Sequence, residues 1–190
     1  MNKKTSSMLS AVALIAVIAL AAFAYPRLTK RAGQNQPTGP AHNPAEQMEE
    51  SGDVQLTVTD ATGAKITLAS KKGKVLILNF WATWCPPCRR ELPAFNKLAD
   101  EYKDKVEFMM IGLTDGARET VDKVKKFVAD NKYTFPLYFD TEKQASSAFG
   151  IRGIPVTVAI GANGKVLSKK VGAMNEDELS SMIKSATESN

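Results

Sequence analysis

The sequence predicts one α/β domain whose central mixed β-sheet is flanked by helices. Continuous apolar runs at 75–81 and 106–113 are typical of strands that are buried on both faces of a sheet. Between them, 86–102 repeats apolar residues at helical spacing, and the order strand, helix, strand implies a parallel crossover. The chain has 190 residues, 44% of them hydrophobic, so it can bury one core but has no room for a second catalytic domain.

The domain is expected to span 54–190 and to open with a β-hairpin. Apolar residues alternate along 54–59, a polar turn follows at 60–63, and 65–68 forms the returning strand. The buried strand at 75–81 is then expected at the centre of the sheet, because its apolar run is typical of a strand covered on both faces.

Further elements continue the α/β alternation after the second buried strand. A helix over about 119–131 and a short strand at 136–139 form another αβ unit, and a helical turn follows at 144–149. The domain is expected to end with a β-hairpin and a helix that Asn175 and Glu178 cap. The strands of this hairpin are 155–160 and 165–171, joined by Ala162-Asn163-Gly164.

Residues 1–25 have the pattern of a secretory signal peptide or signal anchor. The 18 residues 8–25 carry no charge, a length between that of a signal-peptide apolar region and that of a membrane-spanning helix. Ala22-Phe23-Ala24 fits a cleavage site, whereas Arg27, Lys30 and Arg31 suit a retained anchor. We expect an uncleaved anchor that places the domain outside the cytoplasm, in the periplasm or on the outer face of the cytoplasmic membrane.

A tether is predicted over 26–53. This segment contains Pro37, Gly39, Pro40 and Pro44 and almost no residue that a core would bury. A flexible coil of this length spans on the order of 30 Å. The tether would let the domain swing at the membrane surface.

The charge distribution gives no sign of a nucleic-acid surface. The net charge of +5 divides into +1 for 1–53 and +4 for 54–190, and Lys123, Lys125 and Lys126 form a basic cluster. This cluster lies in a helical pattern without interleaved aromatic residues, whereas a nucleic-acid footprint is a stripe on a strongly basic domain. We expect a solvated helix face and no nucleic-acid partner.

The two cysteines, Cys85 and Cys88, point to chemistry rather than to a disulfide scaffold. They are separated by two residues, so they cannot join distant parts of a fold, and disulfide-scaffold proteins carry more cysteines. A closed zinc site needs four ligands, yet the chain has no other cysteine and its single histidine, His42, precedes the domain. An inert short-range crosslink is the other structural alternative. A C-x-x-C sequence in a βαβ setting instead favours a redox pair, which requires no metal or cofactor.

Cys85 follows a buried strand and starts a helix, which suits a nucleophilic thiolate. Unpaired amides and the dipole at a helix N-terminus stabilise an anion, so Cys85 is expected to ionise more easily than a free thiol. Cys88, on the first turn, is close enough to attack the mixed disulfide and release the substrate. Pro86 and Pro87 suit the first turn but lack amide hydrogens, so amide support for the Cys85 sulfur must come largely from Cys88 onward.

Two motifs occur in the order expected of a known family. The first is Asn79-Phe80-Trp81-Ala82-Thr83-Trp84-Cys85-Pro86-Pro87-Cys88, followed by Glu91 and Pro93, and the second is Gly153-Ile154-Pro155-Val156-Thr157. Together they resemble the ResA/TlpA family of membrane-tethered or periplasmic thioredoxin-like reductases. The resemblance covers about 54–189, including the opening hairpin, and identifies the αβ unit as a central insertion. It implies a thioredoxin-like fold and thiol-disulfide oxidoreductase activity.

The resemblance assigns further residues to the site. It implies that Ile154-Pro155 is a cis peptide bond beside the cysteines, with neighbouring backbone that pairs with the substrate chain as an added strand. Taken alone, Pro155 would more often be a trans proline that opens a strand. Glu91 lies three residues after Cys88 on the same helix face, and the family has an acid there that can exchange a proton with the resolving thiol. An ordinary solvated glutamate is the alternative.

Three other residues of the first motif carry expectations. Asn79 replaces the aspartate that cytoplasmic thioredoxins use as a buried proton acceptor, and because an amide cannot titrate, that role is left to Glu91. Trp84 is expected to shield the Cys85 sulfur and to offer the substrate an apolar contact, whereas Trp81 is expected in the core. A plain packing role is the alternative for either ring. The other expected substrate contacts are Pro86, Pro87, Ile154 and Pro155.

The expected reaction is reduction of a disulfide in an exported protein, after which a membrane-embedded thiol donor restores the dithiol. Apocytochrome c is the substrate that the family suggests. A disulfide oxidase or isomerase is the alternative, since direction depends on how strongly the reduced form is stabilised. Strongly oxidising relatives place a histidine between the cysteines, and the prolines found here favour reduction.

Two other classes of protein fit less well. Peroxiredoxins have a threonine three residues before the reactive cysteine, where this chain has Ala82. A non-catalytic copper module is conceivable because two thiolates suit Cu(I), but no histidine lies near the pair.

Overall fold

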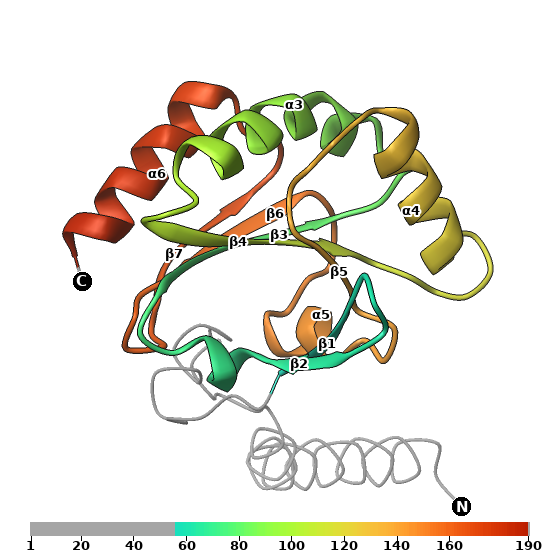
Figure 1. Ribbon diagram of the computed structural model, residues 1–190, viewed down its shortest axis with the longest axis horizontal. Coiled ribbons are helices and arrows are strands. Elements are labelled where there is room, and N and C mark those ends of the chain that lie inside the picture. The colour runs from blue at the N-terminus through green and yellow to red at the C-terminus, as the bar shows by residue number, and fades with distance from the viewer. Residues whose placement is uncertain (1–55, 190) are drawn as a thin grey trace, which may run out of the picture. The chain divides into compact units, whose positions relative to one another are not determined.

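Seven strands form one mixed β-sheet in the computed structural model, which describes residues 56–189 (Figure 1). The strands are β1 (Thr57–Asp60), β2 (Lys65–Thr67), β3 (Val75–Trp81), β4 (Val106–Gly112), β5 (Leu137–Phe139), β6 (Val156–Ile160) and β7 (Val166–Val171). Their order along the sheet is β2-β1-β5-β4-β3-β6-β7. The neighbours β3, β4 and β5 run parallel, and the remaining pairings are antiparallel.

Every residue of β3 is buried, so this strand lies at the centre of the core, as its apolar sequence predicts. Its side chains alternate between the two faces of the sheet. Ile77 and Trp81 pack into one apolar cluster, and Leu76 and Phe80 pack into a second cluster on the opposite face. By the same alternation Asn79 belongs to the Ile77 face.

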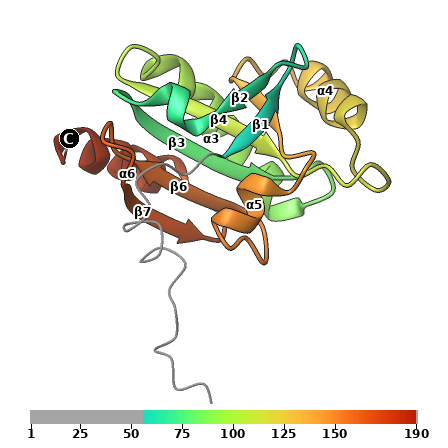
Figure 2. The same cartoon turned by 90° about the horizontal axis from the view of Figure 1, so that it is seen from below.

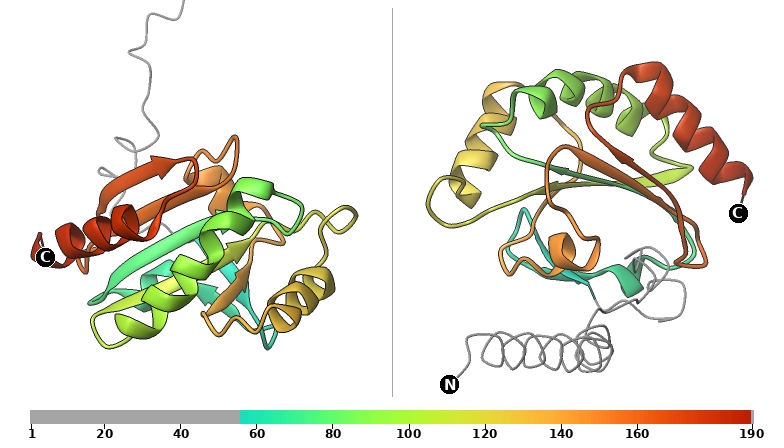
Figure 3. Two further views of the ribbon diagram at one scale, coloured as in Figure 1. Left: turned by 90° about the horizontal axis from the view of Figure 1, so that it is seen from above. Right: turned by 180° about the vertical axis from the view of Figure 1, so that it is seen from behind.

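Helices cover both faces of the sheet. The helices are α3 (Pro86–Glu101), α4 (Val121–Asp130), α5 (Gln144–Ala148) and α6 (Glu176–Glu188), and a 3₁₀ turn, η1, spans Leu68–Lys71. Helices α3, α4 and α6 lie over the face of Ile77 and Trp81, whereas α5 lies on the other side (Figures 1 and 2). The view from behind in Figure 3 shows the same division. The capping box that the sequence predicts for α6, between Asn175 and Glu178, is present.

The N-terminal hairpin and the central insertion are joined to each other. Strand β5, which follows α4 in the insertion, pairs in parallel with β4 and antiparallel with β1. The hairpin of β1 and β2 is therefore attached to the rest of the sheet through the insertion. The predicted architecture, a mixed sheet flanked by helices with an N-terminal hairpin and an αβ insertion, is confirmed.

Helix α4 begins two residues later than the position near 119 that apolar spacing predicts. Thr120 is its N-cap, because the Thr120 side chain accepts a hydrogen bond from the backbone N–H of Lys123 at 3.2 Å. Lys123, Lys125 and Lys126 are exposed on this helix, as predicted for a solvated face. Glu119 precedes the N-cap, so it lies outside the helix, and its side chain binds Thr83 instead.

The predictions for 1–25 and 26–53 fall outside the described residues. Between residues 56 and 189, no helix has the length and apolar character needed to cross a membrane.

Candidate active site

The two cysteines lie at the carboxyl end of β3, where the chain turns into α3. Cys85 is the N-cap residue of α3, and Pro86, Pro87 and Cys88 follow it as the first turn. The two sulfur atoms are joined in a disulfide. Cys85 exposes 3% of its surface and Cys88 exposes none, so only Cys85 is open to an incoming group.

The sulfur of Cys85 has one amide donor within its own helix. The backbone N–H of Cys88 donates a hydrogen bond to Cys85 Sγ at 3.3 Å. Pro86 and Pro87 occupy the first two helical positions and have no N–H, so amide support comes from Cys88, as the sequence predicts. The same N–H would stabilise negative charge on this sulfur once the disulfide is opened.

The loop before β6 meets the disulfide from another side. The carbonyl oxygen of Ile154 lies 3.8 Å from Cys85 Sγ, and the Ile154-Pro155 peptide bond is cis, as the resemblance implies. Within residues 56–189, the Ile154 backbone makes no backbone–backbone hydrogen bond. An extended peptide that lies beside Cys85 can therefore pair with Ile154.

Glu91 is a buried carboxylate on α3, one turn beyond Cys88. It exposes only 2% of its surface, so the alternative of a solvated glutamate is wrong. Its Oε1 accepts a hydrogen bond from Asn79 Nδ2 at 2.8 Å, and its Oε2 accepts one from the backbone N–H of Met174 at 2.9 Å. Loss of hydration outweighs these two hydrogen bonds and raises the pKa of Glu91 to about 7. The carboxylate therefore changes charge near neutral pH.

The two tryptophans of the motif have different surroundings. Trp81 is fully buried, with its ring against Phe127 and Phe135, as expected of a core residue. Trp84 is 42% exposed, and the guanidinium of Arg118 lies over its ring, 3.7 Å from the centroid. Trp84 thus presents an apolar surface next to Cys85 in the chain.

Glu119 is a site residue that the sequence analysis missed. Its buried carboxylate accepts hydrogen bonds from the backbone N–H and the hydroxyl of Thr83, at 2.7 and 2.8 Å. Thr83 belongs to the turn between β3 and Cys85, so Glu119 fixes the turn that presents the disulfide. The one sign of this in the sequence is that Glu119 follows the second buried strand, at the sheet edge that carries the cysteines.

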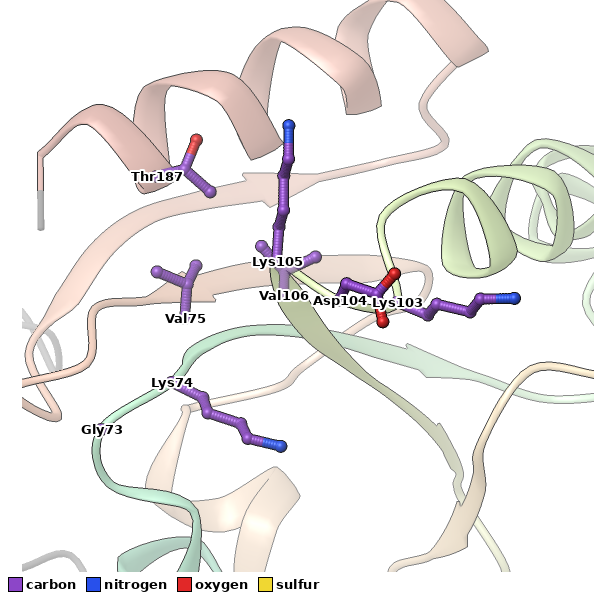
Figure 4. A pocket seen from close by; sticks show the side chains of 8 residues that line it. All are labelled: Gly73, Lys74, Val75, Lys103, Asp104, Lys105, Val106 and Thr187. Carbon is purple, nitrogen blue, oxygen red and sulfur yellow. The ribbon is translucent and has the colours of Figure 1, made fainter.

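A hollow of about 350 Å³ lies at the opposite end of the sheet, near the starts of β3 and β4 (Figure 4). Lys74, Lys103 and Lys105 line it, but their side chains point in different directions, and Lys103 is paired with Asp100 at 3.1 Å. The described part of the chain also holds no group of three or more His, Cys, Asp or Glu side chains placed to bind a metal ion. Among the described residues, the cysteine pair at the carboxyl end of β3 is therefore the candidate active site.

Residues 43–185 match the model of the redoxin family. The chain belongs to the redoxin family. The relative described as thiol-disulfide oxidoreductase ResA of Bacillus thuringiensis (strain Al Hakam) is 37% identical to this redoxin over 133 residues, which cover 70% of this chain and 75% of that protein. The redoxin is a thiol-disulfide oxidoreductase of the ResA kind, and Cys85 and Cys88 are its cysteine pair.

Solved structures place the fold of the redoxin among the thioredoxins. A thiol:disulfide interchange protein of the thioredoxin family from Chlorobium tepidum TLS matches with a TM-score of 0.60 at 29% identity, over 69% of this chain and 92% of that one. A secreted Mycobacterium tuberculosis disulfide oxidoreductase homologous to E. coli DsbE gives a TM-score of 0.60 at 28% identity, over 70% of this chain and 96% of that one. The predicted thioredoxin-like fold is confirmed.

Glu91 should make the stability of the oxidised redoxin depend on pH. Its folded-state pKa of about 7 lies above the ordinary value of 4.5, so between these pH values the folded protein keeps a proton that the unfolded chain has lost. This stabilising contribution is complete below pH 4.5 and is lost as the pH rises through 7. We expect Glu91→Gln to abolish the loss, about 3 kcal/mol in size. Urea unfolding of both proteins from about pH 4 to 8 measures it, and parallel curves would contradict the assignment.

Removing the Glu119 carboxylate should weaken the turn before Cys85. In Glu119→Ala the N–H and the hydroxyl of Thr83 lose their partner, so we expect the free energy of unfolding to fall by about 1–3 kcal/mol. Glu119→Gln keeps an acceptor oxygen and should lose less. As a control, Glu142→Ala removes an exposed glutamate paired with Lys65 and should cost less than about 1 kcal/mol. Equal losses in Glu119→Ala and Glu142→Ala, measured by urea denaturation, would refute the role of Glu119.

Proposed function

We propose that the redoxin reduces disulfides in exported proteins, using the Cys85–Cys88 dithiol. The observation that carries the proposal is the 3.8 Å approach of Cys85 Sγ to Ile154, whose backbone has no backbone partner among the described residues. A cystine in an extended protein chain would be held beside Cys85 by hydrogen bonds to this backbone. A small disulfide would need no such support.

The reaction begins when the Cys85 thiolate of the reduced enzyme attacks one sulfur of the substrate disulfide. A bond forms between Cys85 and that sulfur while the substrate S–S bond breaks, and the departing thiolate takes up a proton. Cys88, as a thiolate, then attacks Cys85 Sγ, which forms the internal disulfide and releases the second substrate thiol. Two electrons and two protons thereby pass from the dithiol to the substrate.

Glu91 is assigned the proton exchange with Cys88. It lies one turn beyond Cys88 on α3, and its pKa of about 7 suits a group that both accepts and returns a proton near neutrality. Its hydrogen-bond partner Asn79 cannot titrate, so the carboxylate carries this role in the cluster. The exposed ring of Trp84, together with Pro86, Pro87, Ile154 and Pro155, forms the substrate contact.

The setting of the reaction is proposed from the sequence and the relatives. The segment 1–25 anchors the chain, 26–53 tethers the domain, and the active site faces the space outside the cytoplasm. The relative from Mycobacterium tuberculosis is described as secreted, which supports this location. Apocytochrome c is the proposed substrate, and a membrane-embedded thiol protein is the proposed electron donor.

Trapping the mixed disulfide tests the order of attack. With a peptide that carries an oxidised Cys-x-x-Cys-His sequence, the pattern of a c-type haem attachment site, the reduced Cys88→Ser variant should accumulate a covalent adduct through Cys85. Cys85→Ser should accumulate none, because Cys88 is fully buried. Mass spectrometry under non-reducing conditions identifies the adduct. An adduct with Cys85→Ser alone would reverse the proposed roles.

The reduction potential of the full chain tests the direction of the reaction. Equilibration against redox buffers should give a value near or below the roughly −270 mV of thioredoxin. A value approaching the roughly −120 mV of the strongest periplasmic oxidant would make the redoxin a disulfide donor instead. An intermediate value would favour an isomerase.

A further inference from the structure

Each arginine of the described residues is close, in sequence or by contact, to a residue of the candidate active site. Residues 56–189 contain four arginines, namely Arg89, Arg90, Arg118 and Arg152. Two follow Cys88 on α3, one stacks on Trp84, and one lies two residues before Ile154. All four are exposed, and none forms an ion pair within this part of the chain, where the ion pairs use lysines. Arg118, the arginine that contacts the exposed Trp84, therefore has no carboxylate partner among the described residues.

Arg118 is placed where a substrate would meet Trp84. Its guanidinium carbon lies 3.7 Å from the centroid of the Trp84 ring. A guanidinium stacked in this way keeps its N–H groups in its own plane, so its edge can donate two parallel hydrogen bonds to a carboxylate. Nearby carboxylates do not compete for it, because Glu119 binds Thr83 and Asp115 accepts two backbone N–H groups of its own loop.

The contact between Glu119 and Thr83 holds this arrangement in place. Arg118 directly precedes Glu119, and Trp84 directly follows Thr83. Thr83 donates two hydrogen bonds to Glu119, at 2.7 and 2.8 Å. These bonds hold the chain next to Trp84 against the chain next to Arg118, and so keep the two stacked side chains close to each other. A site supported in this way is ordered before the substrate arrives.

We propose that Arg118 and the exposed Trp84 ring select disulfides that have an aspartate or glutamate beside the attacked cysteine. This inference rests on the proposed function and specifies which residue lies beside the cystine of the substrate. The Trp84 ring covers the apolar part of the substrate chain, and Arg118 binds the carboxylate. Arg152 lies two residues before Ile154 and adds positive charge to the loop whose Ile154 carbonyl approaches Cys85.

Three peptides that share one cystine and differ only in a flanking Glu, Gln or Lys test the proposal. With the reduced full-length chain, kcat/KM for the Glu peptide should exceed that for the Gln peptide by about two- to fivefold, as for an exposed ion pair. The Lys peptide should be slowest. The preference should shrink as salt is added. Arg118→Gln should bring the Glu-to-Gln ratio close to one, and Arg118→Lys should keep part of it because the charge remains.

Lys105→Gln is the matched control, because it removes the same charge at the opposite end of the sheet (Figure 4). It should leave the ratio at the wild-type value. A wild-type ratio of one, or equal losses in Arg118→Gln and Lys105→Gln, would overturn the proposal. Circular dichroism confirms that each variant is folded.

A second measurement separates this proposal from the proposed function. The same peptides with serine in place of cysteine are titrated into the oxidised chain, and quenching of tryptophan fluorescence reports their Kd. The Glu peptide should bind about two- to fivefold more tightly than the Gln peptide, and this difference should vanish in Arg118→Gln. If none of the cystine peptides is reduced, the proposed function fails, while the binding ratio still decides the arginine site.

Discussion

The carboxylate of Glu91 joins three parts of the domain that are distant in sequence. It is held by Asn79 on β3 and by the backbone of Met174 just before α6, and it is itself part of α3. A buried carboxylate without partners would be costly, so these three elements must come together as one arrangement. The same arrangement fixes α3 against the end of β3, and with it the helix N-terminus at which Cys85 lies. The packing of the domain thus depends on the same titratable group for which we propose the proton exchange with Cys88.

The remaining parts of the site come from one edge of the sheet. The cysteines follow the carboxyl end of β3, and Glu119 and Arg118 follow the carboxyl end of the parallel neighbour β4. Loops at this edge of parallel strands meet one another, which is why α/β proteins gather their chemistry there. The β4–α4 loop therefore borders the active site, where Glu119 binds Thr83 and Arg118 stacks on the exposed Trp84 ring. The insertion adds a functional surface as well as a strand.

Local patterns in the sequence predicted most of the fold and the chemical centre of the site. The apolar run of β3 placed it in the core, and the position of Cys85 after a strand and before two prolines predicted a sulfur at a helix start. The role of Glu119 was not predicted, because apolar spacing assigned this residue to the following helix and its partner Thr83 lies 36 residues earlier. The burial of Glu91 and its contact with Met174 also depend on tertiary packing, which the periodicity of apolar residues does not predict. The family resemblance, not the spacing, pointed to the cis bond at Pro155.

The attachment of β1 to β5 imposes an order on biogenesis. In the register of the sheet, Thr59 lies opposite Phe139, about 80 residues further along the chain. An isolated two-stranded hairpin is marginally stable in water. Strands β1 and β2 are the first strands of the domain to be made, but they cannot join the rest of the sheet until β5 has been synthesised. Until then they present an open strand edge of the kind that chaperones cover and that aggregation exploits. The first strands of the domain to be made are consequently fixed in the sheet only after a strand about 80 residues later has been made.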